Sequence, residues 1–208
     1  MLDPAFTLAG SPVSWLEAWA FVLALAGVAL TVWENHWGWP FSIAASALYA
    51  WLFFINRLYG DAALQLFFIA ISIWGWRAWL LGGPPGQGGE HAPGEAGRLP
   101  IRRLRPLQAL ALLASLLAAW LVLGALLARY TDTDVPWFDG FPTAGSLIAQ
   151  TLLARKLFEA WPLWIVVNAV AMALFAWKAL WLTVLLYALL LGLSGAGLMR
   201  WRKRLGSP

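Results

Sequence analysis

Cysteine is absent from this chain of 208 residues, and histidine occurs only twice, as His36 and His91. The missing thiols exclude disulfides, thiolate metal sites, iron–sulfur clusters and cysteine nucleophiles. Because the two histidines lie in different segments of the chain, a metal or haem site built from imidazoles has little support. We therefore expect no cofactor.

Charge is also scarce, since 12% of the residues are charged, 62% are hydrophobic and the mean hydropathy is +0.71. Soluble domains carry about a quarter charged residues, so this composition argues against an ordinary cytosolic enzyme. Long apolar runs recur instead from end to end, as in a polytopic membrane protein. At roughly 20 residues per crossing, the chain has room for about seven helices and no separate soluble domain. The predicted fold class is an all-α membrane protein with seven transmembrane helices.

The apolar segments divide the chain into three parts. The segments are 15–33, 39–55, 61–81, 106–129, 141–157, 161–177 and 180–199. We expect a first three-helix unit over 15–81, a linker helix over 106–130 and a second three-helix unit over 141–201. The Gly- and Pro-rich stretch 82–105 predicts a flexible cytoplasmic loop. It is not a phosphate cradle, because no Lys-Ser/Thr pair follows its glycines.

Basic residues are distributed unequally between the two sides of a seven-helix arrangement. One side receives Arg77, Arg98, Arg102, Arg103, Arg105, Arg155, Lys156, Arg200, Arg202, Lys203 and Arg204, and the other receives Arg57, Arg129 and Lys178. The positive-inside rule then predicts a cytoplasmic C-terminus and a periplasmic N-terminus. The expected outer loop 130–140, which carries three aspartates, would be solvated on the periplasmic side. The basic excess indicates topology and contact with anionic lipid, not nucleic acid.

The two ends of the chain show weak internal similarity. In the third and seventh segments, a constant offset of 122 residues aligns Asp61, Gln65, Ser72, Gly75 and Trp79 with Thr183, Tyr187, Ser194, Gly197 and Trp201. In the second and sixth segments, an offset of 124 residues aligns Asn35-x-Trp37 with Glu159-x-Trp161. A single helix between two three-helix units gives both units the same orientation. The pattern therefore predicts parallel repeats about an axis along the membrane normal, with substrate between them near mid-membrane.

Polar residues within the apolar segments are candidate substrate contacts, because a polar side chain in hydrocarbon needs a partner or a cavity. Trp161, Trp164 and Asn168 share one helix face, at i, i+3 and i+7. Further polar stripes follow the second, third and seventh segments. The candidate lining residues are Trp161, Trp164, Asn168, Gln65, Tyr187, Tyr49, Ser72, Asn35, Trp39 and Glu159. The alternative is structural, since serines often bond the preceding helical turn and tryptophans often occupy interfacial belts.

Aromatic walls with a few amides suit a flat cation that carries hydroxyl groups. An indole face attracts a ring cation by roughly 0.5–2 kcal/mol, and an Asn amide offers two donors and two acceptors. No carboxylate lies deep in a segment, because Glu34, Asp61 and Glu159 all fall near segment ends. This distribution favours facilitated diffusion over a proton-coupled pump, and it leaves open Na⁺ coupling through backbone carbonyls. A membrane enzyme is the weaker alternative, since no histidine lies near a mid-helix serine.

Several longer motifs occur along the chain. They are WENHWGWP from Trp33, LYAW from Leu48, LYGDAALQ from Leu58, GWxxW from Gly75, TDTDVPWFDGF from Thr131, ARKLFEAWPLWIVVN from Ala154, and the pair Leu186–Tyr187. Taken together, these motifs resemble the PnuC family of bacterial vitamin transporters. The resemblance extends over about residues 15–201. It implies a full-length SWEET-like fold of 3+1+3 helices, usually assembled as a homotrimer in the bacterial inner membrane.

The same resemblance implies a function. Such proteins take up nicotinamide riboside by facilitated diffusion, and phosphorylation in the cytoplasm then traps the product for NAD synthesis. The family's substrate-contacting Trp-x-x-Trp-x-x-x-Asn pattern falls on Trp161, Trp164 and Asn168, and its third-helix Gln falls on Gln65. Many relatives carry Asp where Asn168 stands. Thiamine is the alternative cargo, because it is also an aromatic cation and cation–π attraction does not separate the two vitamins.

Overall fold

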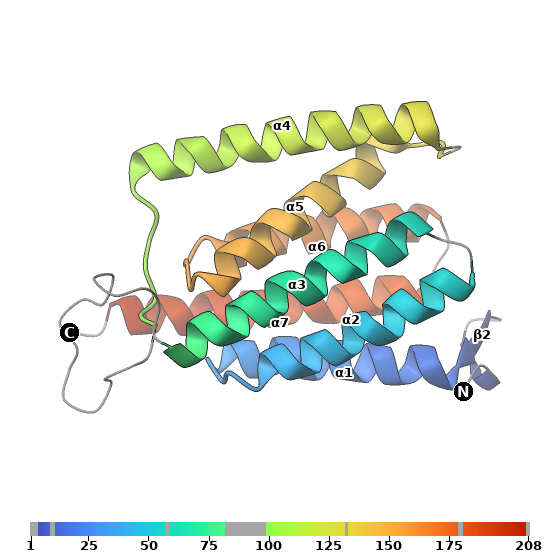
Figure 1. Cartoon of the computed structure of the whole chain (residues 1–208), viewed down its shortest axis with the longest axis horizontal. Coiled ribbons are helices and arrows are strands. Elements are labelled where there is room, and N and C mark those ends of the chain that lie inside the picture. Colours follow the sequence, from blue (N-terminus) through green and yellow to red (C-terminus); the bar gives the residue numbers. More distant parts are fainter. Residues whose placement is uncertain are drawn as a thin grey trace. The chain divides into compact units, whose positions relative to one another are not determined.

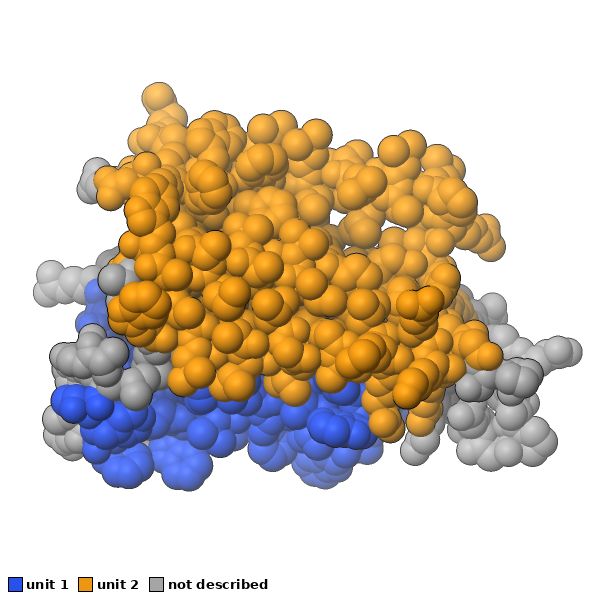
Figure 2. Space-filling model, turned by 180° about the vertical axis from the view of Figure 1, so that it is seen from behind, with its two compact units in different colours: residues 1–100 blue, residues 101–208 orange. Residues whose placement is uncertain are grey.

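The computed structural model describes residues 4–8, 11–56, 59–81, 99–131, 133–178 and 181–206. The chain divides into two compact units, Met1–Pro100 and Ile101–Pro208, which Figure 2 colours separately. Most of the predicted Gly- and Pro-rich loop, residues 82–98, lies outside the described residues, as do His91 and Asp132.

The first unit contains a short hairpin followed by three helices (Figure 1). Its elements are β1 (Pro4–Leu8), β2 (Ser11–Ser14), α1 (Trp15–Val32), α2 (Gly38–Ile55) and α3 (Tyr59–Leu81). The two strands are antiparallel, and α2 packs against both α1 and α3. Ser14 caps α1, because its Oγ accepts a hydrogen bond from the Glu17 backbone N–H at 3.2 Å.

Two glycines allow α1 and α2 to approach each other closely. A Cβ atom at Gly38 would lie 2.7 Å from the carbonyl oxygen of Gly27, and one at Gly27 would lie 2.6 Å from Ser42 Oγ. Nearby hydroxyls are satisfied within their own helices, since Thr31 Oγ1 donates to the Gly27 carbonyl and Ser42 Oγ donates to the Gly38 carbonyl. In a membrane the hydrophobic effect does not drive helices together, so close van der Waals packing at small residues stabilises such a crossing instead.

The second unit contains four helices (Figure 1). They are α4 (Pro106–Tyr130), α5 (Pro136–Ala154), α6 (Ala160–Trp177) and α7 (Trp181–Leu205). In this unit α5 packs against α4 and α6, and α6 packs against α5 and α7. Both α4 and α5 have proline in the first turn, where its missing N–H leaves no intrahelical bond unmade. Trp137 fills the space beside Gly124 and joins α5 to α4, since the Trp120 indole N–H donates to its carbonyl at 2.7 Å.

The segment before α4 is attached to the turn between α5 and α6. Arg102 forms a parallel bridge with Leu157, in which Arg102 N–H donates to the Lys156 carbonyl at 3.1 Å and Phe158 N–H donates to the Arg102 carbonyl at 2.8 Å. The Leu104 N–H adds a third bond, to Glu159 Oε1 at 3.1 Å. The entry to the second unit is therefore anchored before its first helix begins.

Six of the seven helices are long and apolar enough to cross a membrane, within the residues that the structure describes. These spans are Trp15–Val32, Gly38–Ile55, Asp61–Leu81, Pro106–Tyr130, Ala160–Trp177 and Thr183–Leu205. The prediction of an α-helical membrane fold with seven helices is confirmed, and the N-terminal hairpin was not predicted. The helix outside the set of six is α5, which contains Asp139 and an internal proline, Pro142.

Two helices differ from their predicted bounds by more than two residues. The fifth helix begins at Pro136 rather than 141 and ends at Ala154 rather than 157, so Asp139 lies in its first turn and not in an outer loop. Pro136 supplies a preformed φ for the first helical position, which makes it a start signal. The seventh helix continues to Leu205, beyond the predicted end at 199. Its last turn is basic, and cations there interact favourably with the negative end of the helix dipole.

Backbone features recur 122 positions apart. The middle helices Gly38–Ile55 and Ala160–Trp177 begin and end at this spacing. So do Glu34 and Lys156, the non-glycine residues with positive φ in the described part of the chain, at 57° and 52°. The offset of 124 residues inferred for the second and sixth segments is therefore wrong. Trp161 corresponds to Trp39, because each tryptophan precedes a proline in the first turn of its helix.

Candidate functional site

Each unit contains a buried tryptophan pair that joins its middle helix to its last helix. In the second unit, the ring centroids of Trp161 and Trp201 lie 5.4 Å apart with an interplanar angle of 88°. In the first unit, Trp39 and Trp79 also lie 5.4 Å apart, at 85°. Edge-to-face contact is the favoured geometry of aromatic pairs. Two of the candidate site residues, Trp161 and Trp39, therefore lie in the interior of their own units.

The Trp161 ring depends on a glycine of the facing helix. A Cβ atom at Gly197 would lie 2.6 Å from three atoms of the Trp161 indole. The missing side chain thus lets the ring lie flat against α7. Gly197 was identified in the sequence only as a repeat match, and the structure gives it a packing role beside Trp161.

Asn168 lies seven positions after Trp161 on α6 and is 2% exposed. Its Nδ2 donates to Ser194 Oγ on α7 at 3.1 Å, and Ser194 Oγ in turn donates to the Leu190 carbonyl at 2.8 Å. The other atom of the amide, Oδ1, is buried and has no hydrogen-bond partner among the described residues. An unpaired buried acceptor destabilises a folded protein by about 1–3 kcal/mol. This oxygen therefore does not contribute to stability, which favours a functional role for it.

The remaining candidates of the second unit lie on the same two helices. Trp164 is half-buried on α6, and the half-buried Tyr187 ring on α7 stacks on Phe175 of α6 with centroids 5.3 Å apart. The structure thus brings Trp161, Asn168 and Tyr187 into contacts across the α6–α7 pair, with Trp164 on the same helix.

The candidates of the first unit lie on α2 and α3. Gln65 is half-buried on α3, and Ser72 on the same helix is 1% exposed. Tyr49 is half-buried on α2 and stacks on Phe53, with centroids 5.9 Å apart. These residues form a separate group within their own unit.

Asn35 and Glu159 have structural contacts beside the middle helices. Asn35 Oδ1 accepts a hydrogen bond from the Trp37 N–H at 3.0 Å, which forms an Asx turn just before α2. Glu159 immediately precedes α6 and holds the Leu104 N–H through Oε1. Both side chains thus order the approach to a helix, whereas their contact with substrate stays a prediction.

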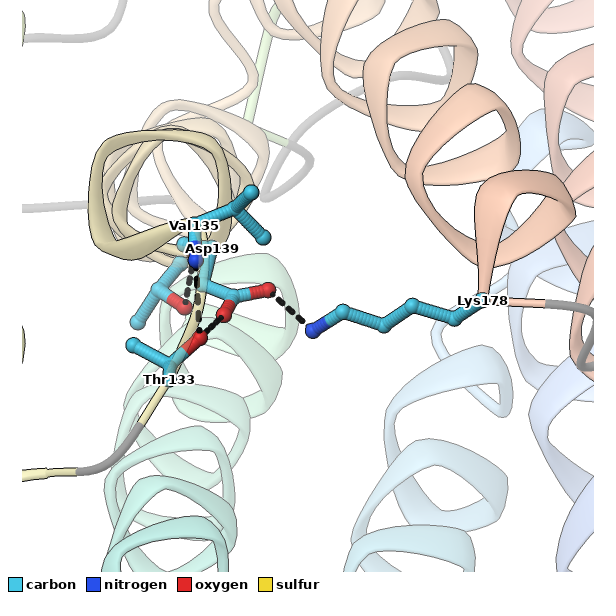
Figure 3. A network of polar contacts seen from close by, with 5 residues as sticks. Thr133, Val135, Asp139 and Lys178 are labelled. Carbon is cyan, nitrogen blue, oxygen red and sulfur yellow. Dashed lines mark hydrogen bonds and ion pairs between the residues drawn. The ribbon is translucent and has the colours of Figure 1, made fainter.

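A polar network that the sequence did not predict ties the start of α5 to the end of α6 (Figure 3). Lys178 Nζ forms an ion pair with Asp139 Oδ1 at 2.8 Å, and the Thr133 hydroxyl donates to Asp139 Oδ2. The Val135 N–H donates to Thr133 Oγ1 at 3.4 Å. The signal was hidden because residues 130–140 were interpreted as one solvated loop. The Lys178 and Asp139 side chains are 38% and 21% exposed, so the pair contributes about 0–1 kcal/mol.

The α6–α7 pair carries aromatic rings, one amide and hydroxyls, which are groups that can bind a ligand by stacking and hydrogen bonding. Among the described residues, no group of three or more histidines and carboxylates is placed to hold a metal ion. Glu159 is the carboxylate closest in sequence to the motif, and it lies just outside α6. The arrangement suits an aromatic ligand with hydrogen-bonding groups.

Known proteins resemble this chain over most of its length. Residues 14–203 match the family model described as nicotinamide mononucleotide transporter. The chain is 26% identical over 216 residues to the nicotinamide riboside transporter PnuC of Escherichia coli (strain K12), covering 92% of this chain and 87% of that protein. It is 26% identical over 203 residues to the protein of the same name from Neisseria mucosa, covering 93% and 74%.

Two further proteins extend the comparison. The riboflavin/roseoflavin transporter RibM of Streptomyces davaonensis is 25% identical over 171 residues, covering 82% of this chain and 76% of that protein. The crystal structure of the vitamin B3 transporter PnuC has a similar fold, with a TM-score of 0.70 and 24% identity over 91% of this chain and 81% of that one. At this identity the structural likeness supports the fold.

Proposed function

This chain belongs to the nicotinamide mononucleotide transporter family, and on that premise we propose that it carries nicotinamide riboside across the bacterial inner membrane by facilitated diffusion. The family consists of transporters, so the chain is a transporter and not an enzyme. Relatives named for nicotinamide riboside align with more than nine-tenths of the chain, which supports this cargo.

The observation that carries the proposal is the interior position of the Trp-x-x-Trp-x-x-x-Asn residues on α6. Trp161 and Asn168 are buried against α7, and Asn168 Oδ1 has no hydrogen-bond partner among the residues that the structure describes. An aromatic cation with hydroxyl and carboxamide groups would meet indole faces and that acceptor. Gln65, Ser72, Tyr49 and Tyr187 complete the proposed lining.

We infer a SWEET-like 3+1+3 architecture in which α4 links two parallel three-helix repeats. The matched bounds of α2 and α6, the left-handed residues Glu34 and Lys156 and the two tryptophan pairs support it. In this architecture α5 also crosses the membrane, which completes the seven crossings. Its 19 residues extend about 28 Å, which is long enough to do so. Its one carboxylate, Asp139, is paired with Lys178, which lowers the cost of placing it near the membrane.

The proposed transport cycle is a rocking motion of the two repeats around the bound vitamin. Among the described residues, the carboxylates within helices are Glu17, Asp61 and Asp139, and all three lie in first turns, so the cycle needs no titrating group at mid-membrane. Phosphorylation inside the cell then drives net uptake toward NAD synthesis. The excess of basic residues on one side supports a periplasmic N-terminus and a cytoplasmic C-terminus. The proposed assembly is a homotrimer, which is what the resemblance to the PnuC family implies.

Flux measurements in proteoliposomes test the mechanism. Labelled nicotinamide riboside should equilibrate across the membrane without concentrating, and gradients of pH or Na⁺ should leave the final level unchanged. Protein-free liposomes give the background rate. Accumulation above the external concentration would overturn uniport.

Thiamine is the second candidate cargo, because it is also an aromatic cation. Competition against labelled nicotinamide riboside separates the two, since an excess of thiamine should displace little of it. Riboflavin belongs in the same experiment because RibM is a relative. Its ring system carries no positive charge, so it should compete weakly. A stronger effect of either vitamin than of unlabelled nicotinamide riboside would reassign the cargo.

A further inference from the structure

We propose that Ser194 is a positioning residue that fixes the Asn168 amide, so that Asn168 Oδ1 accepts a hydrogen bond from a neutral donor group of the substrate. The inference rests on the proposed function and deepens it, because it names the chemical feature that this part of the site selects. It predicts discrimination against ligands that present only acceptors at that point, such as a carboxylate.

The hydroxyl group of Ser194 has one proton, and its position is fixed by a main-chain contact. Its Oγ lies 2.8 Å from the carbonyl oxygen of Leu190, one turn earlier on α7. A carbonyl oxygen can only accept, so the hydroxyl proton must lie in this contact. The remaining lone pairs of Ser194 Oγ can therefore only accept a hydrogen bond.

The contact with Ser194 fixes the orientation of the Asn168 amide. Asn168 contacts Ser194 Oγ at 3.1 Å, and an atom that only accepts must receive a proton from its partner. The contacting atom is therefore Nδ2, and Oδ1 is directed elsewhere. This orientation follows from hydrogen-bond chemistry, and it does not depend on telling nitrogen from oxygen by position.

Asn168 Oδ1 is left as a buried hydrogen-bond acceptor. The Asn168 side chain is 2% exposed, and Oδ1 is buried without a hydrogen-bond partner in the described residues. A buried acceptor gains most from a donor group and repels another group of lone pairs. Because the oxygen is covered, substrate binding requires movement of the groups that cover it. Nicotinamide riboside offers two kinds of neutral donor, the carboxamide N–H groups and the ribose hydroxyls.

The first unit lacks this device. The positions 122 residues before Asn168 and Ser194 are Ser46 and Ser72, and neither carries an amide. Ser72 is as deeply buried as Ser194, but position 46 offers it no amide to orient. Among the described residues, the Asn168–Ser194 contact therefore has no counterpart at the positions 122 residues earlier.

Calorimetry on the full-length protein in detergent tests the proposal. The ligands are nicotinamide riboside, nicotinic acid riboside, which lacks the carboxamide donor, and the 2′-deoxy and 3′-deoxy ribosides, which each lack one hydroxyl donor. The wild type should disfavour the analogue that lacks the donor read by Asn168. Ser194→Ala should weaken nicotinamide riboside binding about ten-fold, the equivalent of one hydrogen bond, and reduce the preference over that analogue by a similar factor.

Matched variants separate positioning from packing. Thr151 Oγ1 donates to the Leu147 carbonyl at 2.8 Å, the same one-turn contact that Ser194 makes, so Thr151→Val should change neither affinity nor preference. In an Asn168→Asp background, Ser194→Ala should lose its effect on preference, because a carboxylate presents an acceptor in either orientation. Ser194→Cys keeps nearly the same volume with a weak acceptor and serves if Ser194→Ala does not fold.

The outcomes distinguish the two hypotheses. If the Ser194 variants weaken all ligands by the same factor, Ser194 acts only in packing and the positioning proposal is wrong, while the proposed function stands. If the wild type does not bind nicotinamide riboside, the proposed function fails. A changed preference that persists in the Asn168→Asp background would also overturn the role of amide orientation.

Discussion

Trp161 and Trp201 meet edge to face with their ring centroids 5.4 Å apart, and Trp39 and Trp79 repeat the contact at the same distance 122 residues earlier. The first unit makes this contact without the Trp-x-x-Trp-x-x-x-Asn pattern. The pair therefore holds the middle helix to the last helix in each unit. In the second unit the same ring also begins the proposed binding motif, so packing and recognition share one residue.

Trp161 and Trp164 should respond differently to truncation. Trp161 is 1% exposed, so Trp161→Ala should cost about 3–5 kcal/mol of stability through the cavity it leaves. Trp164 is half-buried, so Trp164→Ala should mainly weaken binding of nicotinamide riboside. Thermal unfolding in detergent and calorimetry check the two effects, and equal losses of stability would contradict this division of roles.

Gly197→Ala should destabilise the protein, because the new Cβ atom would lie 2.6 Å from the Trp161 indole. Overpacking of this kind costs about 1–3 kcal/mol. Gly192 is the matched control, since it lies on the same helix and a Cβ atom there meets nothing within 4 Å. Gly192→Ala should stabilise the helix by up to about 1 kcal/mol. Thermal unfolding of the two variants should therefore shift in opposite directions.

Asn168→Ala should weaken nicotinamide riboside binding more than Ser46→Ala does. Asn168 is buried, and its Oδ1 has no hydrogen-bond partner within the described part of the chain, whereas Ser46 is the half-buried residue 122 positions earlier. The loss expected for Asn168→Ala is about ten-fold or more, the equivalent of one buried hydrogen bond. Calorimetry that gave the reverse order would remove Asn168 from the site.

The ion pair of Lys178 with Asp139 should add little to stability. Since both side chains are partly exposed, a double-mutant cycle with Lys178→Met and Asp139→Asn should give a coupling below about 1 kcal/mol. The coupling should fall further at high salt because exposed charges are screened. A coupling of several kcal/mol at high salt would show that the pair is desolvated in the membrane.

The absence of cysteine makes membrane topology directly testable. Thr131 and Arg202 are both exposed. The predicted topology places Thr131 on the periplasmic side and Arg202 on the cytoplasmic side. A membrane-impermeant maleimide should label Thr131→Cys in intact cells, and it should label Arg202→Cys only after the membrane is opened. The opposite pattern would reverse the proposed orientation.

Apolar length located the helices, but it did not fix all of their ends. The fifth helix was placed too late because Asp139 interrupts its apolar run and residues 130–140 were assigned to a loop, although Asp139 lies in the first turn of the helix. The seventh helix continues through basic residues whose charge suits its C-terminus. Helical ends depend on capping and dipole effects that a count of apolar residues does not contain.

The candidate site was predictable where one helix carries it. The spacing of Trp161, Trp164 and Asn168 placed them on one face of α6 without further information. The bond from Asn168 to Ser194 was not predicted, because it depends on how α6 and α7 pack. The offset of the second and sixth segments was misjudged by two residues, since 16 tryptophans make chance matches common.

The bridge between Arg102 and Leu157 is made by main-chain atoms alone. Main-chain hydrogen bonds form whatever side chains the residues carry, so this junction tolerates substitution at either residue. Proline at position 102 is the exception, because it would remove the N–H that donates to the Lys156 carbonyl. Arg103 adds one side-chain contact to this junction, because its guanidinium lies 4.9 Å from the centroid of the Phe158 ring. The main-chain bonds remain when the arginines of this approach are neutralised, so such replacements should alter membrane orientation before they alter the architecture of the second unit.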